Sequence, residues 1–123
     1  MGIFKKYFGG EPKPGKPIPV SDDTFADDVL NSEIPVAVDF WSPTCAPCQV
    51  MGGLLDEIGP EYLDRVKIVK VRVDHNPGIS GQYGIRSIPT LILFHKGKEI
   101  HRQVGLIPLN PMRQLFDKLA AMK

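Results

Sequence analysis

Val36-Ala37-Val38-Asp39-Phe40-Trp41 is almost entirely apolar and leads, through Ser42-Pro43-Thr44, into Cys45-Ala46-Pro47-Cys48. A nearly continuous apolar run of this length is typical of a strand that is buried on both faces, which requires helices on both sides of a sheet. Apolar residues then recur at helical spacing between Val50 and Tyr62, so a helix is expected directly after the cysteines. The sequence therefore predicts an α/β domain with a cysteine pair at a junction between strand and helix.

These two cysteines are the only ones among 123 residues. If the helix begins at Thr44 or Cys45, the sulfur of Cys45 lies against unpaired N–H groups and the positive end of the helix dipole, which favours a thiolate over a thiol. The i, i+3 spacing brings Cys48 onto the same face, within reach of a disulfide. A thiolate beside a second thiol is what thiol–disulfide exchange requires, so redox chemistry is the leading prediction.

Length and composition limit the alternatives. The chain is long enough for one domain with its own core, and its net charge of +1 gives no basic field for nucleic acid. No apolar run is long enough to cross a bilayer, and Met1 to Gly10 lack the apolar stretch of a secretory signal peptide. A single close cysteine pair in such a chain fits a reducing compartment, where these pairs are catalytic or bind metal. We therefore expect a cytoplasmic protein.

Residues 1–17 differ from the rest of the chain because they are rich in proline, glycine and lysine. This composition predicts a flexible leader in front of a domain at residues 18–123. Ile3–Phe8 is a candidate membrane-surface anchor, but two helical turns bury too little apolar area to hold the chain alone. Gly2 suggests myristoylation, although Lys6 stands where that motif has Ser or Thr. The flexible tail is the favoured prediction.

The remaining segments predict the order β-α-β-α-β-α-β-β-α. Pro60 should end the helix after the cysteines at Gly59, because it cannot donate a backbone hydrogen bond. The other predicted elements are a short edge strand at 18–20, a helix from Ser21 or Asp22 to Asn31, a strand at 66–74, a short helix capped by Asn76 and running from Pro77 to about Tyr83, a hairpin of strands at 90–95 and 99–104, and a helix that opens at Asn110-Pro111. This order gives a three-layer sandwich, with a mixed sheet of about four or five strands between about four helices.

Several short motifs in this chain resemble the thioredoxin family. They are Val38-Asp39-Phe40-Trp41, Cys45-Ala46-Pro47-Cys48, Val73-Asp74, Tyr83-Gly84-Ile85, Ile88-Pro89-Thr90 and Val104-Gly105, and the similarity runs from about Ile18 to Leu119. A lone Cys-x-x-Cys is weak, whereas the same motif between an Asp-Phe-Trp strand and a later Ile-Pro-Thr is specific. The resemblance implies a thioredoxin fold and an oxidoreductase that reduces disulfides in client proteins. It also implies that no bound cofactor is needed and that a thioredoxin-reductase-type partner supplies the electrons.

The resemblance further implies a role at each matching position. Cys45 matches the attacking thiol, Cys48 the buried resolving thiol, and Asp39 the buried acid that helps to deprotonate the resolving thiol. Lys70 matches the lysine near that acid, and Pro89 the cis-proline that lies against the disulfide and presents backbone to a substrate strand. The substrate-docking surface of the family falls on Trp41, Thr44, Ala46, Pro47, Ile88, Val104 and Gly105. Independently, a carboxyl inside an apolar strand is expected to have a raised pKa, which suits proton transfer near neutral pH.

The chain also departs from the family pattern at five positions. Thr44 replaces a usual Trp, Ala46 a Gly, Gln49 a basic residue, Gly53 a proline that kinks the helix, and Ser87 a residue of Gly or Ala size before Ile-Pro. Thr44 is a candidate helix cap, but it removes a large aromatic side chain from the docking surface. Gln49 lacks the charge that stabilises a thiolate, so we expect Cys45 to ionise at a slightly higher pH. We expect altered choice of partners rather than lost chemistry.

Simpler interpretations of these residues stay open. The cysteines could bind zinc or copper, but zinc needs four ligands and the histidines, which are more simply surface residues, show no metal-like spacing: His75, His95 and His101. Lys70 could equally face solvent, Asp39 could be a strand-end carboxylate, and Pro89 an ordinary trans loop proline.

Two alternatives to a general, monomeric reductase also remain. One is a specialised redox partner of a single client or reductase. The other is a non-catalytic docking module that uses the apolar surface around Trp41 and Pro89.

Overall fold

The computed structural model describes residues 14–123. The predicted anchor at Ile3–Phe8, the myristoylation site at Gly2 and most of the predicted leader therefore lie outside the described residues. The strands are β1 (Ile18–Pro19), β2 (Val36–Trp41), β3 (Lys67–Arg72), β4 (Thr90–His95) and β5 (Lys98–Val104). The helices are η1 (Ala26–Leu30), α2 (Ala46–Ile58), η2 (Gly59–Tyr62), α3 (Pro77–Gln82) and α4 (Leu109–Ala120).

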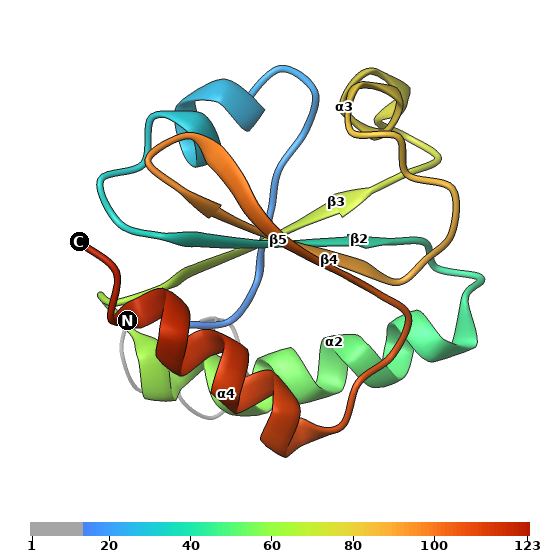
Figure 1. Ribbon diagram of the computed structural model, residues 1–123. Coiled ribbons are helices and arrows are strands. Elements are labelled where there is room, and N and C mark those ends of the chain that lie inside the picture. Colours follow the sequence, from blue (N-terminus) through green and yellow to red (C-terminus); the bar gives the residue numbers. More distant parts are fainter. Residues whose placement is uncertain (1–13) are drawn as a thin grey trace, which may run out of the picture.

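The five strands form one mixed sheet in the order β1-β3-β2-β4-β5. β3 runs parallel to β1 and β2, while β4 pairs antiparallel with β2 and β5. Figure 1 shows the sheet almost edge-on, with α2 and α4 covering one face and η1 and α3 on the other. The predicted three-layer α/β sandwich is confirmed, and β2 lies at its centre.

The apolar side chains separate into one cluster on each face of the sheet. Under α2 and α4 the buried set is Ala37, Met51, Leu55, Ile58, Tyr62, Val66, Ile68, Leu91, Leu93, Ile107, Met112, Phe116 and Leu119. On the other face it is Val20, Phe25, Val29, Val36, Val38, Phe40, Val69, Val71, Ile79, Ile92 and Phe94. Successive residues of β2 and β3 alternate between these clusters, which is why the β2 run contains almost no polar residue. Asp39 is the exception, and it faces α2.

The segment before β2 differs from the helix predicted there. It turns at Ser21, whose carbonyl accepts the N–H of Phe25 at 2.9 Å, and then widens into the π-helix η1, where the N–H of Asn31 bonds to the carbonyl of Ala26. Asp22 does not cap this segment. Its carboxylate instead accepts hydrogen bonds from backbone N–H groups at the start of α3, at 2.8 and 3.0 Å.

The start of α3 therefore departs from a second prediction. Asn76 occupies the N-cap position but makes no side-chain cap bond. Its Oδ1 accepts the N–H of Asp22 at 2.9 Å, and its Nδ2 donates to the carbonyl of Arg72 at 3.0 Å. Asp22 caps α3 instead, and the hydrogen bond from its backbone N–H to Asn76 holds it opposite the start of that helix. The two segments are thereby tied together on this face of the sheet.

α2 ends as predicted. It runs unbroken through Gly52-Gly53 to Ile58, and from Gly59 the chain tightens into the 3₁₀ helix η2, which contains Pro60. One residue of the predicted apolar stripe is not core, since Val50 is 52% exposed. Among the helices of residues 14–123, none is both long enough and apolar enough to span a bilayer.

Candidate active site

The two cysteines form a disulfide at the first turn of α2, with their Cα atoms 5.2 Å apart. Cys45 is the N-cap, and its Sγ accepts the backbone N–H of Cys48 at 3.2 Å. The side chain of Cys45 is half-buried, whereas Cys48 is 2% exposed. Only the sulfur of Cys45 can therefore be approached by a large molecule.

Thr44 does not cap the helix as expected. The cap position belongs to Cys45, and the Thr44 hydroxyl instead lies 3.4 Å from the hydroxyl of Ser42. Ala46, Pro47 and Gln49 are exposed on the first turn of α2, with Pro47 at a position where its missing N–H costs nothing. The N–H of Gln49 bonds to the carbonyl of Cys45 at 3.2 Å. The groups that hold the sulfurs thus come from the backbone.

Asp39 is buried in β2 beneath this turn, with 2% of its surface exposed. Burial raises the pKa of its carboxyl from 3.8 to about 7, and the nearby positive charge of Lys70 offsets part of that rise. Within residues 14–123, no donor lies within hydrogen-bonding distance of its Oδ1. A carboxyl with these properties can take up or release a proton near neutral pH.

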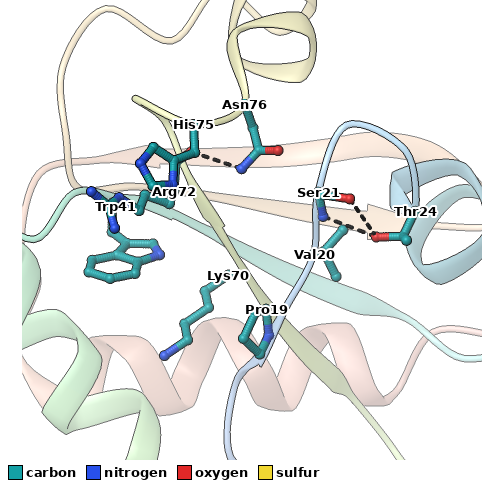
Figure 2. A pocket seen from close by; sticks show the side chains of 9 residues that line it. All are labelled: Pro19, Val20, Ser21, Thr24, Trp41, Lys70, Arg72, His75 and Asn76. Carbon is teal, nitrogen blue, oxygen red and sulfur yellow. Dashed lines mark hydrogen bonds between the residues drawn. The ribbon is translucent and has the colours of Figure 1, made fainter.

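Lys70 lies directly beside Asp39, because the two residues are paired in the parallel β2–β3 ladder. Its Nζ stands 5.4 Å from the centre of the Trp41 ring, a cation–π arrangement. Figure 2 shows the Lys70 side chain running along Trp41 toward α2, away from Arg72 and His75. The lysine therefore faces the side of the sheet on which Asp39 and the sulfurs lie.

A cleft of about 290 Å³ joins these groups. Its lining consists of Pro17, Asp39, Trp41, Cys48, Gln49, Gly52, Gly53, Asp56 and Lys70. Neither glycine carries a side chain into it, and a space of this size admits several water molecules. The cleft offers a path for protons between the Asp39 carboxyl, the buried sulfur of Cys48 and solvent.

A second hollow, of about 460 Å³, lies at the sheet edge beyond β1. Figure 2 shows its lining: Pro19, Val20, Ser21, Thr24, Trp41, Lys70, Arg72, His75 and Asn76. Arg72 is already paired with Asp74 through two hydrogen bonds of 2.9 and 3.0 Å. Trp41 and Lys70 line both hollows and form the wall between them.

The loop before β4 lies against the disulfide. The peptide bond between Ile88 and Pro89 is cis, as predicted, and the carbonyl oxygen of Ile88 lies 3.8 Å from Sγ of Cys45. The carbonyl of Pro89 accepts the N–H of Gly105 at 2.8 Å, which brings the end of β5 to the same place. Val104, on one side of Gly105, is 55% exposed.

Sequence reasoning missed several residues at this site. Leu106 is 44% exposed immediately after Gly105, and Val50 is exposed in the second turn of α2. The sequence offered one signal for Leu106, because it is an apolar residue that directly follows the Val104-Gly105 motif. Asp56 lies on the same face of α2 as Cys48, because Cys48, Gly52 and Asp56 are each four residues apart, and that spacing was a local signal for it. Pro17 enters the cleft only through the tertiary fold, and no local pattern marks it.

None of the three histidines lines the cleft that contains Asp39 and Cys48. His75 and His101 are exposed and His95 is half-buried. Within residues 14–123, no three side chains of the His, Cys, Asp or Glu type are grouped closely enough to hold a metal ion.

A disulfide at a helix N-terminus, with one accessible and one buried sulfur above an acid titrating near neutrality, defines a thiol–disulfide oxidoreductase. The family model described as Thioredoxin matches residues 16–118. Thioredoxin 1 of Synechococcus elongatus is 48% identical over 80% of this chain and 92% of its own length. The chloroplastic M-type thioredoxin of Chlamydomonas reinhardtii is 44% identical over 80% of this chain and 71% of its own length, and the thioredoxin of Haemophilus influenzae is 46% identical over 80% and 92%. The chain belongs to the thioredoxin family, and it is a protein-disulfide oxidoreductase.

Proposed function

We propose that this protein reduces disulfides in client proteins, with Cys45 as the attacking sulfur. The observation that carries this assignment is the difference in exposure between the half-buried Cys45 and the 2% exposed Cys48. The backbone N–H of Cys48, which points at Sγ of Cys45, favours the thiolate in the reduced protein.

The exchange proceeds in two steps. The Cys45 thiolate attacks one sulfur of a client disulfide, so that a mixed disulfide forms and the other client sulfur leaves as a thiolate. Cys48, as its thiolate, then attacks Sγ of Cys45, restoring the internal disulfide and releasing the second client sulfur. Two electrons pass to the client, and a reductase of the thioredoxin-reductase type must return them. The cysteine pair is itself the redox centre in this scheme, which needs no bound cofactor.

In the second step Asp39 accepts the proton of Cys48. Its burial and its place in the same cleft as the sulfur support this role. Lys70, paired beside Asp39 in the sheet, stabilises the carboxylate that results. Pro89 is proposed to hold the client backbone beside the sulfurs, since the carbonyl of the preceding Ile88 lies 3.8 Å from Cys45.

The client docks on the surface around the disulfide. This surface comprises Trp41, Thr44, Ala46, Pro47, Ile88, Val104 and Gly105, to which the exposed Leu106 and Val50 are added. The protein acts as a monomer in a reducing, cytoplasmic compartment, with residues 18–123 as the catalytic domain and residues 1–17 as a leader whose last residues, 15–17, pack against that domain.

Trapping of clients tests this proposal. Cys48→Ser removes the resolving thiol, so client proteins should stay attached to Cys45 through mixed disulfides that dithiothreitol releases. The matched Cys45→Ser variant should trap far fewer. Many trapped proteins indicate a general reductase, and one or two indicate a dedicated partner. If Cys48→Ser traps no more than Cys45→Ser, Cys45 is not the attacking sulfur.

A further inference from the structure

The described chain begins with a segment that packs against the end of α2. Gly15 has a positive φ of 90°, and a Cβ at that position would lie 2.6 Å from the carbonyl oxygen of Gly59. A Cβ on Gly59 would in turn collide with the carbonyl oxygen of Gly15. The two backbones therefore touch directly, and this contact is possible only because both residues lack side chains.

This contact determines where the following residues lie. Pro17 is two positions beyond Gly15 and lines the cleft that contains Asp39 and Cys48. The next residue, Ile18, enters β1 and pairs with Val69 of β3. Pro17 is therefore fixed from both sides, by the glycine contact before it and the sheet after it. Its ring supplies no hydrogen-bond donor to the cleft.

We propose that residues 15–17 are a positioning element for the redox reaction: the Gly15–Gly59 contact holds Pro17 as an apolar wall of the cleft and limits the water that reaches Asp39. The proposal rests on the function assigned above to Asp39. Pro17 is not a catalytic residue, since it acts only through the surroundings of the carboxyl.

The groups around Asp39 explain why the apolar wall formed by Pro17 affects the pKa of this carboxyl. The titratable groups that line its cleft are Lys70 from β3 and Cys48 and Asp56 from α2, and β4 contributes Leu91 as its sheet neighbour. Burial is the largest cause of the raised pKa of Asp39, ahead of the opposing effect of Lys70. Displacing Pro17 admits water and reduces the cost of charging the carboxyl, so the pKa must fall.

Gly59→Ala is the sharpest perturbation. Gly59 has φ −49° and ψ −48°, a helical conformation that alanine adopts without strain, so the new methyl acts only by pushing Gly15 away. Gly81→Ala is the matched control, because it makes the same change in helix α3 and its Cβ would meet nothing within 4 Å. Pro17→Ser is the second variant, which puts a hydroxyl in the wall without touching either glycine.

The titration of Asp39 is measured directly by the ¹³C chemical shift of its carboxyl group in the full-length oxidised protein. The midpoint should fall by about one pH unit or more in Gly59→Ala and in Pro17→Ser, and should not move in Gly81→Ala. If Gly59→Ala does not fold, Pro17→Ser alone decides. An unchanged midpoint in the folded variants overturns the proposal.

A second measurement separates this proposal from the function on which it rests. Asp39→Asn should slow the reduction of a protein disulfide if the carboxyl accepts the Cys48 proton. If Asp39→Asn retains the wild-type rate, the assigned role of Asp39 fails whatever the titration shows. If Asp39→Asn is slow but the titration midpoint of Asp39 is the same in Gly59→Ala and Pro17→Ser as in the wild type, only the positioning role fails.

Discussion

Replacing Asp39 with Asn should change the free energy of unfolding more favourably at pH 8 than at pH 4. In the folded chain, burial raises the pKa of this carboxyl from 3.8 to about 7. The folded state therefore holds a proton over a pH range in which the unfolded chain has lost it. The contribution of Asp39 to the free energy of unfolding of the wild type must therefore fall as the pH rises from about 4 to about 7, and then stay level. Asn has no such dependence.

The magnitude follows from the separation of the two pKa values. Each pH unit of separation corresponds to about 1.4 kcal/mol, so a carboxyl that titrates near 7 instead of 3.8 costs the folded state about 4 kcal/mol at pH 8. The Asn amide brings its own cost, about 1–3 kcal/mol if it finds no partner. That cost is independent of pH, so it cancels when the variant-minus-wild-type difference at pH 4 is subtracted from the difference at pH 8.

The assay is urea unfolding of the oxidised proteins at pH 4, 5, 6, 7 and 8, followed by far-UV circular dichroism. The variant-minus-wild-type difference should grow by about 4 kcal/mol across this range, with most of the change below pH 7. Asp27→Asn, an exposed aspartate on η1, is the control and should change little at any pH. A difference for Asp39→Asn that stays flat from pH 4 to pH 8 would show that burial does not perturb this carboxyl.

Three further substitutions test other parts of the site and fold. Gln49→Lys should let Cys45 form its thiolate at a lower pH, measured by thiolate absorbance near 240 nm in the reduced protein, and identical curves would contradict the expectation. Asp22→Ala removes two hydrogen bonds to backbone N–H groups of α3 and should lower the free energy of unfolding by about 1–2 kcal/mol; an unchanged urea midpoint would rule out the cap. Leu106→Asp should slow the reduction of insulin but not of a small aromatic disulfide, and equal slowing of both would place its effect in the chemistry.

The order of elements could be predicted from the sequence because each signal is local. A strand buried on both faces must be apolar throughout, and a helix against a sheet must repeat its apolar residues at helical spacing. The capping of α3 could not be predicted in this way. Its cap comes from Asp22, 56 positions before Gly78, and only the folded chain brings them together. Asn76 satisfied the local rule for a cap, but its side chain is used by other partners.

The residues of the candidate site also differ in whether local structure or the tertiary fold places them. Cys45, Cys48 and Asp39 belong to one strand-to-helix unit, so their proximity follows from local structure. Asp56 follows as well, because helical spacing puts it on the face of α2 that carries Cys48. The cleft around Asp39 depends in addition on Pro17, which comes from a distant part of the sequence. A proline in a Pro/Gly/Lys-rich segment gives no sign that it lines the cleft of a buried carboxyl, because composition reports stiffness and not position.

None of the five departures from the family pattern removes a backbone group that holds the sulfurs, although Gln49 and Gly53 line the cleft around Asp39. Thr44 and Gln49 are exposed side chains, while the bonds that fix the disulfide run from the backbone N–H of Cys48 to Sγ of Cys45 and from the backbone N–H of Gln49 to the Cys45 carbonyl. Backbone donors survive any side-chain change that leaves the helix intact. We therefore expect the exposed Thr44 to alter which clients dock, whereas Gln49 and Gly53 line the cleft on which the proposed second step depends.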